Sequence, residues 1–132
     1  MAAPPWLSRA HYPFAPHYFP TDAGRLHYVD EGNGPPVVML HGNPTWSFLY
    51  RHLIGHLAPD YRCIAPDFIG FGRSDKPADW SYRPQDHAAH LDALMTQLDL
   101  RAVTLVVHDW GGPIGLSWAL RHPDRVRRLV IT

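Results

Sequence analysis

The stretch Leu105-Val106-Val107-His108-Asp109-Trp110-Gly111-Gly112 joins an apolar run to one acidic residue and then to two glycines. The apolar, β-branched run favours a buried strand, and the glycines allow a sharp turn into a helix. Such a turn exposes one side chain at the edge of a sheet, which is the geometry of a nucleophile elbow. We therefore expect Asp109 to be a nucleophile. Capping of the following helix by Asp109 is the simpler alternative.

A carboxylate suits this position for physical reasons. The dipole and the free backbone N–H groups at the start of a helix favour a negative charge there. An ionised carboxylate can attack a carbon atom and form an ester. The usual elbow has a glycine two positions after the nucleophile, and Gly111 is that glycine here. It also has a small residue two positions before the nucleophile, where this chain has Val107 instead.

Outward from this stretch, apolar runs alternate with segments of helical periodicity. The expected strands are Arg25–Val29, Val37–Leu40, Tyr61–Ala65, Val103–Val107 and Val126–Ile131. The expected helices are Trp46–Leu57, with Thr45 as its N-cap, Pro84–Leu98 and Gly111–His122. The first two strands are expected to form a hairpin, because the turn-forming cluster Asp30-Glu31-Gly32-Asn33-Gly34 lies between them. This order predicts an α/β fold with a mostly parallel sheet.

Length and composition favour one domain and exclude several kinds of partner. The chain has 132 residues, 45% of them hydrophobic, which is enough for one core. Twelve Lys and Arg balance twelve Asp and Glu, so neither nucleic acid nor membrane is an expected partner. The single cysteine, Cys63, and the absence of a secretory leader pattern favour the cytoplasm. Residues 1–20 are expected to be an extended arm and residues 21–132 to belong to one domain.

A second motif, His41-Gly42-Asn43-Pro44-Thr45-Trp46, directly follows the expected buried strand Val37–Leu40. In folds with a nucleophile elbow, the loop at this place supplies one backbone N–H group of an oxyanion hole. The residue after the nucleophile, here Trp110, supplies the other. Taken alone, the motif also fits a turn followed by an N-cap from Asn43 or Thr45.

Three motifs in order resemble the haloalkane dehalogenase family of the α/β-hydrolase fold: the Asn43 loop, Pro66-Asp67-Phe68-Ile69-Gly70-Phe71-Gly72-Arg73-Ser74-Asp75-Lys76-Pro77, and the Asp109 elbow. The resemblance runs from about Tyr28 to Ile131. It implies that Asp109 displaces halide from a small haloalkane to form an ester, which water converts to an alcohol. It also implies that the Asn43 amide and the Trp110 indole N–H hold the halide product, while the backbone N–H groups of both stabilise the oxyanion. No cofactor is implied.

The resemblance covers only the N-terminal part of the family's domain. The family places its general base, a histidine, and the acid that orients it after the strand Val126–Ile131, together with a cap over the pocket. The chain alone is therefore expected to be an inactive fragment. His108 is expected to point away from Asp109, since side chains alternate along a strand, and His41 is expected to have a structural role.

Two other functions remain open. Epoxide hydrolases share an Asp-Trp-Gly elbow and the same ester chemistry, but they usually carry an aromatic residue where Asn43 stands, so Asn43 favours halide chemistry. A chain without base and acid could also act as a non-catalytic module that binds through an open sheet edge. The oligomeric state is not indicated by the sequence.

The ten histidines do not indicate a metal site. His52 and His56 have the i, i+4 spacing of a zinc helix, but the catalytic Glu and any accompanying carboxylate or thiol cluster are missing. His87 and His90 are expected to include one packed and one solvated side chain. We therefore expect no metal.

Overall fold

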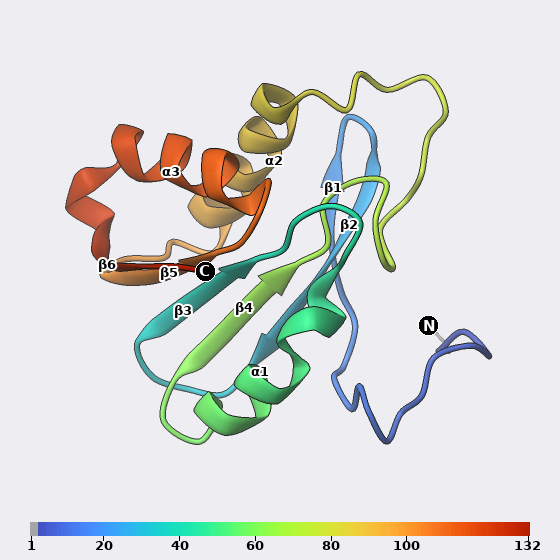
Figure 1. Cartoon of the computed structure of the whole chain (residues 1–132), viewed down its shortest axis with the longest axis horizontal. Coiled ribbons are helices and arrows are strands. Elements are labelled where there is room, and N and C mark those ends of the chain that lie inside the picture. Colours follow the sequence, from blue (N-terminus) through green and yellow to red (C-terminus); the bar gives the residue numbers. More distant parts are fainter. Residues whose placement is uncertain (1–2) are drawn as a thin grey trace.

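A computed structural model describes residues 3–132, which form one six-stranded sheet in the order β1-β2-β4-β3-β5-β6 (Figure 1). The strands are β1 His17–Thr21, β2 Gly24–Glu31, β3 Pro36–Leu40, β4 Arg62–Pro66, β5 Val103–Val107 and β6 Val126–Ile131. The helices are η1 Ser47–Tyr50, α1 Arg51–Leu57, α2 Pro84–Gln97, α3 Gly111–Arg121 and η2 Pro123–Arg125. The four strands β4, β3, β5 and β6 are parallel, as expected.

Each face of the sheet is covered by different elements. Along β3, Val38 and Leu40 belong to one buried cluster, which also contains Leu91 of α2 and Ile114 of α3. The alternate residues of β3 belong to a second cluster on the opposite face, together with Ile54 of α1. This period of two is the normal alternation of a strand, and it explains why β3 is apolar throughout.

The expected hairpin between the first two strands is wrong. Strand β4 lies between β2 and β3, and β2 pairs with β4 in antiparallel register, from Tyr28 with Pro66 to Glu31 with Cys63. The connection from β2 to β3 passes instead over the end of α1. There, a Cβ atom on Gly32 would lie 2.2 Å from the Tyr61 carbonyl oxygen, and Gly32 has a φ of 86°. A glycine is required at this close approach.

The first expected helix differs in its start. A 3-10 turn, η1, precedes α1, and neither has a side-chain cap. The Thr45 hydroxyl donates to the Gly42 carbonyl oxygen at 3.0 Å, so Thr45 is not the expected N-cap. Before these helices, strand β1 occupies part of the stretch expected to be an extended arm, and Tyr12 of that stretch is only 1% exposed.

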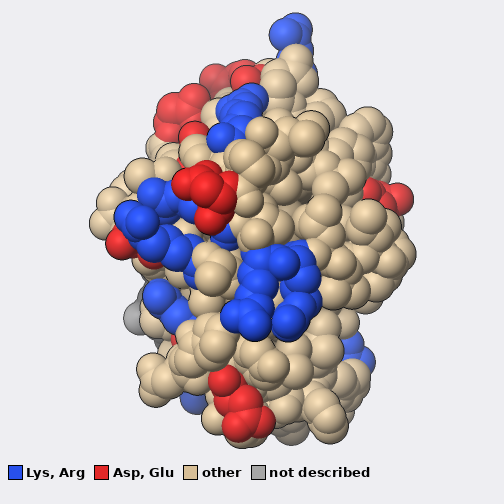
Figure 2. All heavy atoms as spheres, turned by 90° about the vertical axis from the view of Figure 1, so that its left-hand side faces the viewer, with Lys and Arg blue, Asp and Glu red and all other residues tan. Residues whose placement is uncertain are grey.

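The edge of the sheet at β6 exposes apolar side chains. Leu129, Val130 and Ile131 are exposed on the strand, and Leu120 is exposed on α3. Figure 2, which looks at the side of the molecule that bears α3 and β6, shows several groups of basic and acidic side chains with uncharged surface between them. Within residues 3–132, no helix has both the length and the apolar character needed to cross a membrane.

Candidate active site

Asp109 lies at a sharp turn between β5 and α3. Its φ is 53°, a left-handed conformation that is uncommon for a residue with a side chain. The turn brings the start of α3 against the end of β3, where a Cβ atom on Gly111 would lie 2.5 Å from the Leu40 carbonyl oxygen. The strand, the turn and the glycine therefore form the elbow geometry that the sequence predicts, with the Asp109 residue exposed.

The loop after β3 contacts the carboxylate of Asp109 directly. The backbone N–H of Asn43 donates to Asp109 Oδ2 at 2.9 Å. The loop can come this close because residue 42 is glycine: a Cβ atom there would lie 2.2 Å from the Cβ of Asp109. Hydrogen bonds from the backbone of Asn43 and then of Trp110 lower the pKa of Asp109 below its ordinary value. The carboxylate is therefore ionised at neutral pH.

The alternative of simple helix caps is contradicted. Trp110 occupies the N-cap position of α3, and no side chain caps that helix. Trp46 occupies the N-cap position of η1, again without a side-chain hydrogen bond, so neither Asn43 nor Thr45 caps it. The Asp109 carboxylate accepts from the backbone N–H groups of Asn43 and Trp110, and it is not a side-chain cap of α3.

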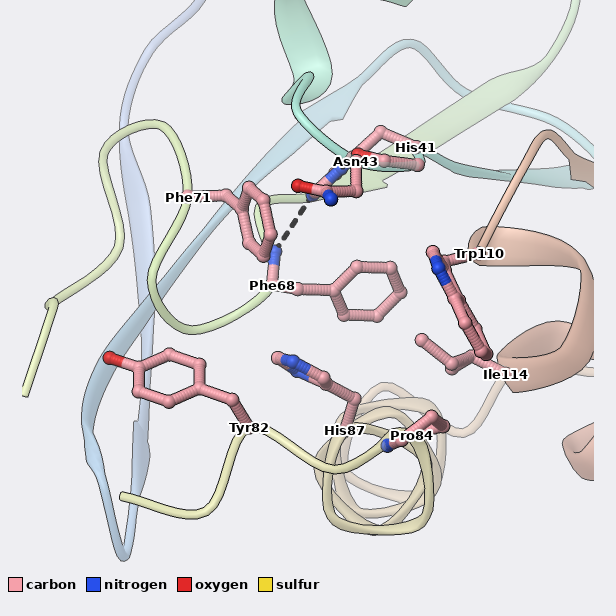
Figure 3. A pocket seen from close by; sticks show the side chains of 10 residues that line it. His41, Asn43, Phe68, Phe71, Tyr82, Pro84, His87, Trp110 and Ile114 are labelled. Carbon is pink, nitrogen blue, oxygen red and sulfur yellow. Dashed lines mark hydrogen bonds between the residues drawn. The ribbon is translucent and has the colours of Figure 1, made fainter. Parts of the chain in front are cut away.

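Beside Asp109, the structure contains a pocket of about 390 Å³. Figure 3 shows Asn43, Trp110 and His87 arranged around the ring of Phe68. The lining residues come from the loop after β3, the loop after β4, the start of α2 and the start of α3: His41, Gly42, Asn43, Phe68, Phe71, Tyr82, Pro84, His87, Trp110 and Ile114. The pocket is thus largely apolar with a few polar side chains, as is common for small-molecule sites.

His41 connects two of the loops around the pocket. It is 1% exposed, its Nδ1 donates to the Gly42 carbonyl oxygen at 2.8 Å, and its Nε2 accepts from the Phe68 N–H at 3.0 Å. Burial lowers the pKa of His41, which keeps the ring neutral. The expected structural role of His41 is confirmed by these contacts.

Two residues of the site were not expected from the sequence. Asp67 is fully buried and accepts from the backbone N–H of Ser47 at 2.7 Å and of Arg73 at 3.0 Å, so it holds the loop after β4 against the start of η1. His87 lies in the pocket itself. The expectation that one of His87 and His90 is solvated is wrong, because they are 6% and 7% exposed. The burial of both histidines is visible only in the structure, because each is a polar residue in the sequence of an amphipathic helix.

The described part of the chain holds no group of three or more His, Cys, Asp or Glu side chains placed to bind a metal ion. His108, the neighbour of Asp109, has its Nδ1 3.3 Å from the hydroxyl and the carbonyl oxygen of Thr132. The polar side chains that line the pocket are those of His41, Asn43, Tyr82, His87 and Trp110.

Residues 35–132 match the family model described as the alpha/beta hydrolase fold, and the chain belongs to this family. It is similar to Haloalkane dehalogenase 2 of Mycobacterium tuberculosis, 46% identical over 91% of this chain and 42% of that protein. It is also similar to a cis-3-alkyl-4-alkyloxetan-2-one decarboxylase of Shewanella oneidensis, 49% identical over 90% of this chain and 38% of that protein. The crystal structure of the haloalkane dehalogenase DatA from Agrobacterium tumefaciens superposes with a TM-score of 0.83 and 44% identity, over 89% of this chain and 40% of that one.

The chain thus spans about two fifths of the length of the relatives it matches. The resemblance to haloalkane dehalogenases stated from the motifs is confirmed, as is the α/β-hydrolase fold.

Proposed function

We propose that this chain carries the nucleophile and the halide site of a hydrolase that releases halide from small haloalkanes. The observation that carries this proposal is the ionised Asp109 carboxylate, exposed at the elbow and bonded by the Asn43 backbone beside a largely apolar pocket. Such a pocket favours a small alkyl group over water. Two of its lining residues, Asn43 and Trp110, bond the Asp109 carboxylate through their backbone N–H groups, which places the carboxylate next to the pocket.

In the first step, an Asp109 oxygen attacks the carbon that bears the halogen. A C–O bond forms while the carbon–halogen bond breaks, so the halide leaves with the bonding electron pair and an alkyl ester of Asp109 remains. The side-chain amide of Asn43 and the indole N–H of Trp110, both in the pocket lining, donate to the departing halide. Two neutral donors at the wall of a largely apolar pocket can stabilise this charge without a cation.

In the second step, water attacks the carbonyl carbon of the ester and an alcohol is released. The backbone N–H groups of Asn43 and Trp110 stabilise the oxyanion that forms. This step requires a base, and the two histidines that line the pocket, His41 and His87, do not supply one. His41 uses both ring nitrogens in hydrogen bonds, and burial lowers the pKa of His87 to about 4. We therefore propose that this chain alone forms the ester but does not turn over.

A second candidate reaction is the decarboxylation of an oxetan-2-one, because decarboxylases of cis-3-alkyl-4-alkyloxetan-2-ones are 48% and 49% identical to this chain. Attack of Asp109 on the ring carbon would break the C–O bond and leave a free carboxylate. Loss of CO2 would then form a carbon–carbon double bond and expel Asp109 as a carboxylate. This route needs no external base, so it does not require His41 or His87 of the pocket to take up a proton.

The two reactions are distinguished by their products with the full-length protein that carries this chain. Halide is measured with 1-chlorohexane and CO2 with a cis-3,4-dialkyloxetan-2-one, in the unmodified protein and in Asp109→Asn. We expect halide release that the substitution abolishes. Undiminished halide release in Asp109→Asn would remove the nucleophile role, and CO2 without halide would favour the second reaction.

The cellular location and the small-molecule partners are also part of the proposal. Haloalkane, water and halide are the proposed small-molecule partners. Cys63 is fully buried, and burial raises the pKa of its thiol to about 11, so the thiol is protonated and poorly reactive. A single inert cysteine is compatible with the proposed cytoplasmic location.

A further inference from the structure

We infer that His87 is a specificity residue that binds a hydrogen-bonding oxygen on the substrate, on the alkyl chain away from the reacting carbon. The inference deepens the proposed function and rests on it, since it concerns the same pocket. The substrate class that it indicates is an alkyl compound with a hydroxyl, ether or carbonyl oxygen remote from its leaving group.

The first support is the position of the imidazole. His87 lies one turn into α2, and its side chain extends from that helix toward Phe68 (Figure 3). Its ring centroid is 5.3 Å from that of Phe68 and 4.9 Å from that of Trp80. The residue lines the pocket although it is only 6% exposed. A polar ring is thus held among aromatic rings at the wall of an apolar pocket.

The second support is an unsatisfied hydrogen-bonding atom. Within the described residues, the buried Nδ1 atoms of His87 and of His90 both have no hydrogen-bond partner, and of these two residues only His87 lines the pocket. A buried polar atom without a partner costs free energy, and native proteins retain few of them. Because Nδ1 is buried, the ring must turn this atom toward the pocket before a substrate oxygen there can supply the missing partner. Binding would then recover that free energy.

The third support comes from the other polar side chains of the pocket, which are already engaged. His41 uses both of its ring nitrogens, and the Tyr82 hydroxyl donates to the Pro77 carbonyl oxygen. Asn43 and Trp110 are assigned to the leaving group. Among the residues that line the pocket, this leaves His87 as the polar side chain available for another part of the substrate.

The protonation state of His87 fits this role. Burial, followed by the neighbouring His90 and His41, lowers the pKa of His87 to about 4. At neutral pH the ring is uncharged and offers one N–H donor and one acceptor nitrogen. It therefore suits a neutral oxygen group such as an alcohol rather than a carboxylate or an ammonium group.

His90 provides a matched control in the same helix. It is 7% exposed, and its ring stacks on Trp80 with a centroid distance of 4.8 Å. Its Nε2, however, lies 2.6 Å from Asp22 Oδ1, and the residue does not line the pocket. Replacement of His90 thus tests aromatic packing on α2 without removing a pocket side chain.

The test compares 6-chloro-1-hexanol with 1-chlorohexane as substrates of the full-length protein, by halide release. The ratio of the two kcat/KM values is measured in the unmodified protein, in His87→Phe, in His87→Gln and in His90→Phe. We expect the ratio to fall about tenfold in His87→Phe, which corresponds to the loss of one hydrogen bond. It should recover in part in His87→Gln and stay unchanged in His90→Phe. An unchanged ratio in His87→Phe would overturn the inference.

If the protein releases no halide at all, the proposed function is wrong, but the inference about His87 is not yet tested. A binding measurement tests it in that case. The ring nitrogens of His87 are followed by ¹⁵N NMR during a titration with 1-hexanol, and His87→Phe assigns their signals. We expect a saturable shift of the His87 nitrogens but not of the His90 nitrogens. His87 signals that do not move would overturn the inference, whatever the enzyme does.

Discussion

Gly42 and Asp109 are in such close contact that a methyl group on residue 42 would lie 2.2 Å from the Cβ of the carboxylate residue. This contact joins the loop after β3 to the elbow after β5, and the two strands are neighbours in the parallel sheet. The carboxyl ends of parallel strands lie at the same edge of a sheet, so residues distant in the sequence meet there. The position of the Asn43 N–H on Asp109 depends on this contact.

Gly42→Ala is therefore expected to displace the loop and to reduce steady-state halide release by at least about a hundredfold, because the loss of one oxyanion donor slows hydrolysis of the ester and so the return of free Asp109. The steric conflict should also lower the free energy of unfolding by about 1–3 kcal/mol. Gly55→Ala is the matched control: Gly55 lies in α1 with nothing within 4 Å of its would-be Cβ. That control should stabilise the protein slightly. Full activity in Gly42→Ala would show that the close contact is not required.

Asn43→Ala tests the side-chain amide, since the backbone N–H remains. We expect halide release to fall by about a hundredfold while the free energy of unfolding changes by less than about 1 kcal/mol. Urea unfolding and halide-release rates are measured on the same samples. Equal losses of activity and stability would instead support a role as a turn residue only.

Tyr12→Phe removes one end of a buried hydrogen bond, because the Tyr12 hydroxyl lies 2.6 Å from Ser47 Oγ. We expect the free energy of unfolding to fall by about 1–2 kcal/mol, since the Ser47 hydroxyl loses its partner. The double variant Tyr12→Phe with Ser47→Ala should recover part of the loss, because no unpaired hydroxyl then remains. Additive losses in the double variant would mean that the two hydroxyls are not coupled.

The pH dependence of stability provides a test of the burial of His87. In the folded protein its pKa is lowered to about 4, whereas an unfolded histidine has a pKa of about 6.5. Between these values the unfolded chain binds more protons, so the free energy of unfolding should fall as the pH falls from 6.5 to 4, by about 3 kcal/mol at most. Urea unfolding at pH 7, 5.5 and 4 measures this dependence. It should be reduced in His87→Phe. Identical pH profiles of both proteins would contradict the lowered pKa.

Local patterns in the sequence were sufficient for most elements but not for their arrangement. The strand Val103–Val107 and the start of the next helix at Gly111 agree with the structure to the residue. The pairing of β2 with β4 could not be predicted, because the turn residues between β2 and β3 equally suit a hairpin and a wider connection. Strand pairing is decided by contacts between distant segments.

The same distinction applies to the site. The sequence identifies Asp109, Asn43 and Trp110 as candidates because they lie in motifs, and the structure brings the loop of Asn43 to Asp109. Their catalytic roles remain predictions. Asp67 also lies in a motif, but neither Asp67 nor His87 could be singled out, because their importance comes from burial and from partners that lie far away in the sequence.

The contact between Tyr12 and Ser47 has a consequence for the engineering of this protein. Tyr12 packs against Trp46, with ring centroids 5.1 Å apart, and both Trp46 and Ser47 follow closely on the loop of Asn43. The segment ahead of the sheet is therefore part of the support of that loop. Chimeras that exchange only this segment with a homologue would alter the rigidity of a loop that lies more than thirty positions further along the chain. In a combinatorial library, residues 12 and 47 should be varied together.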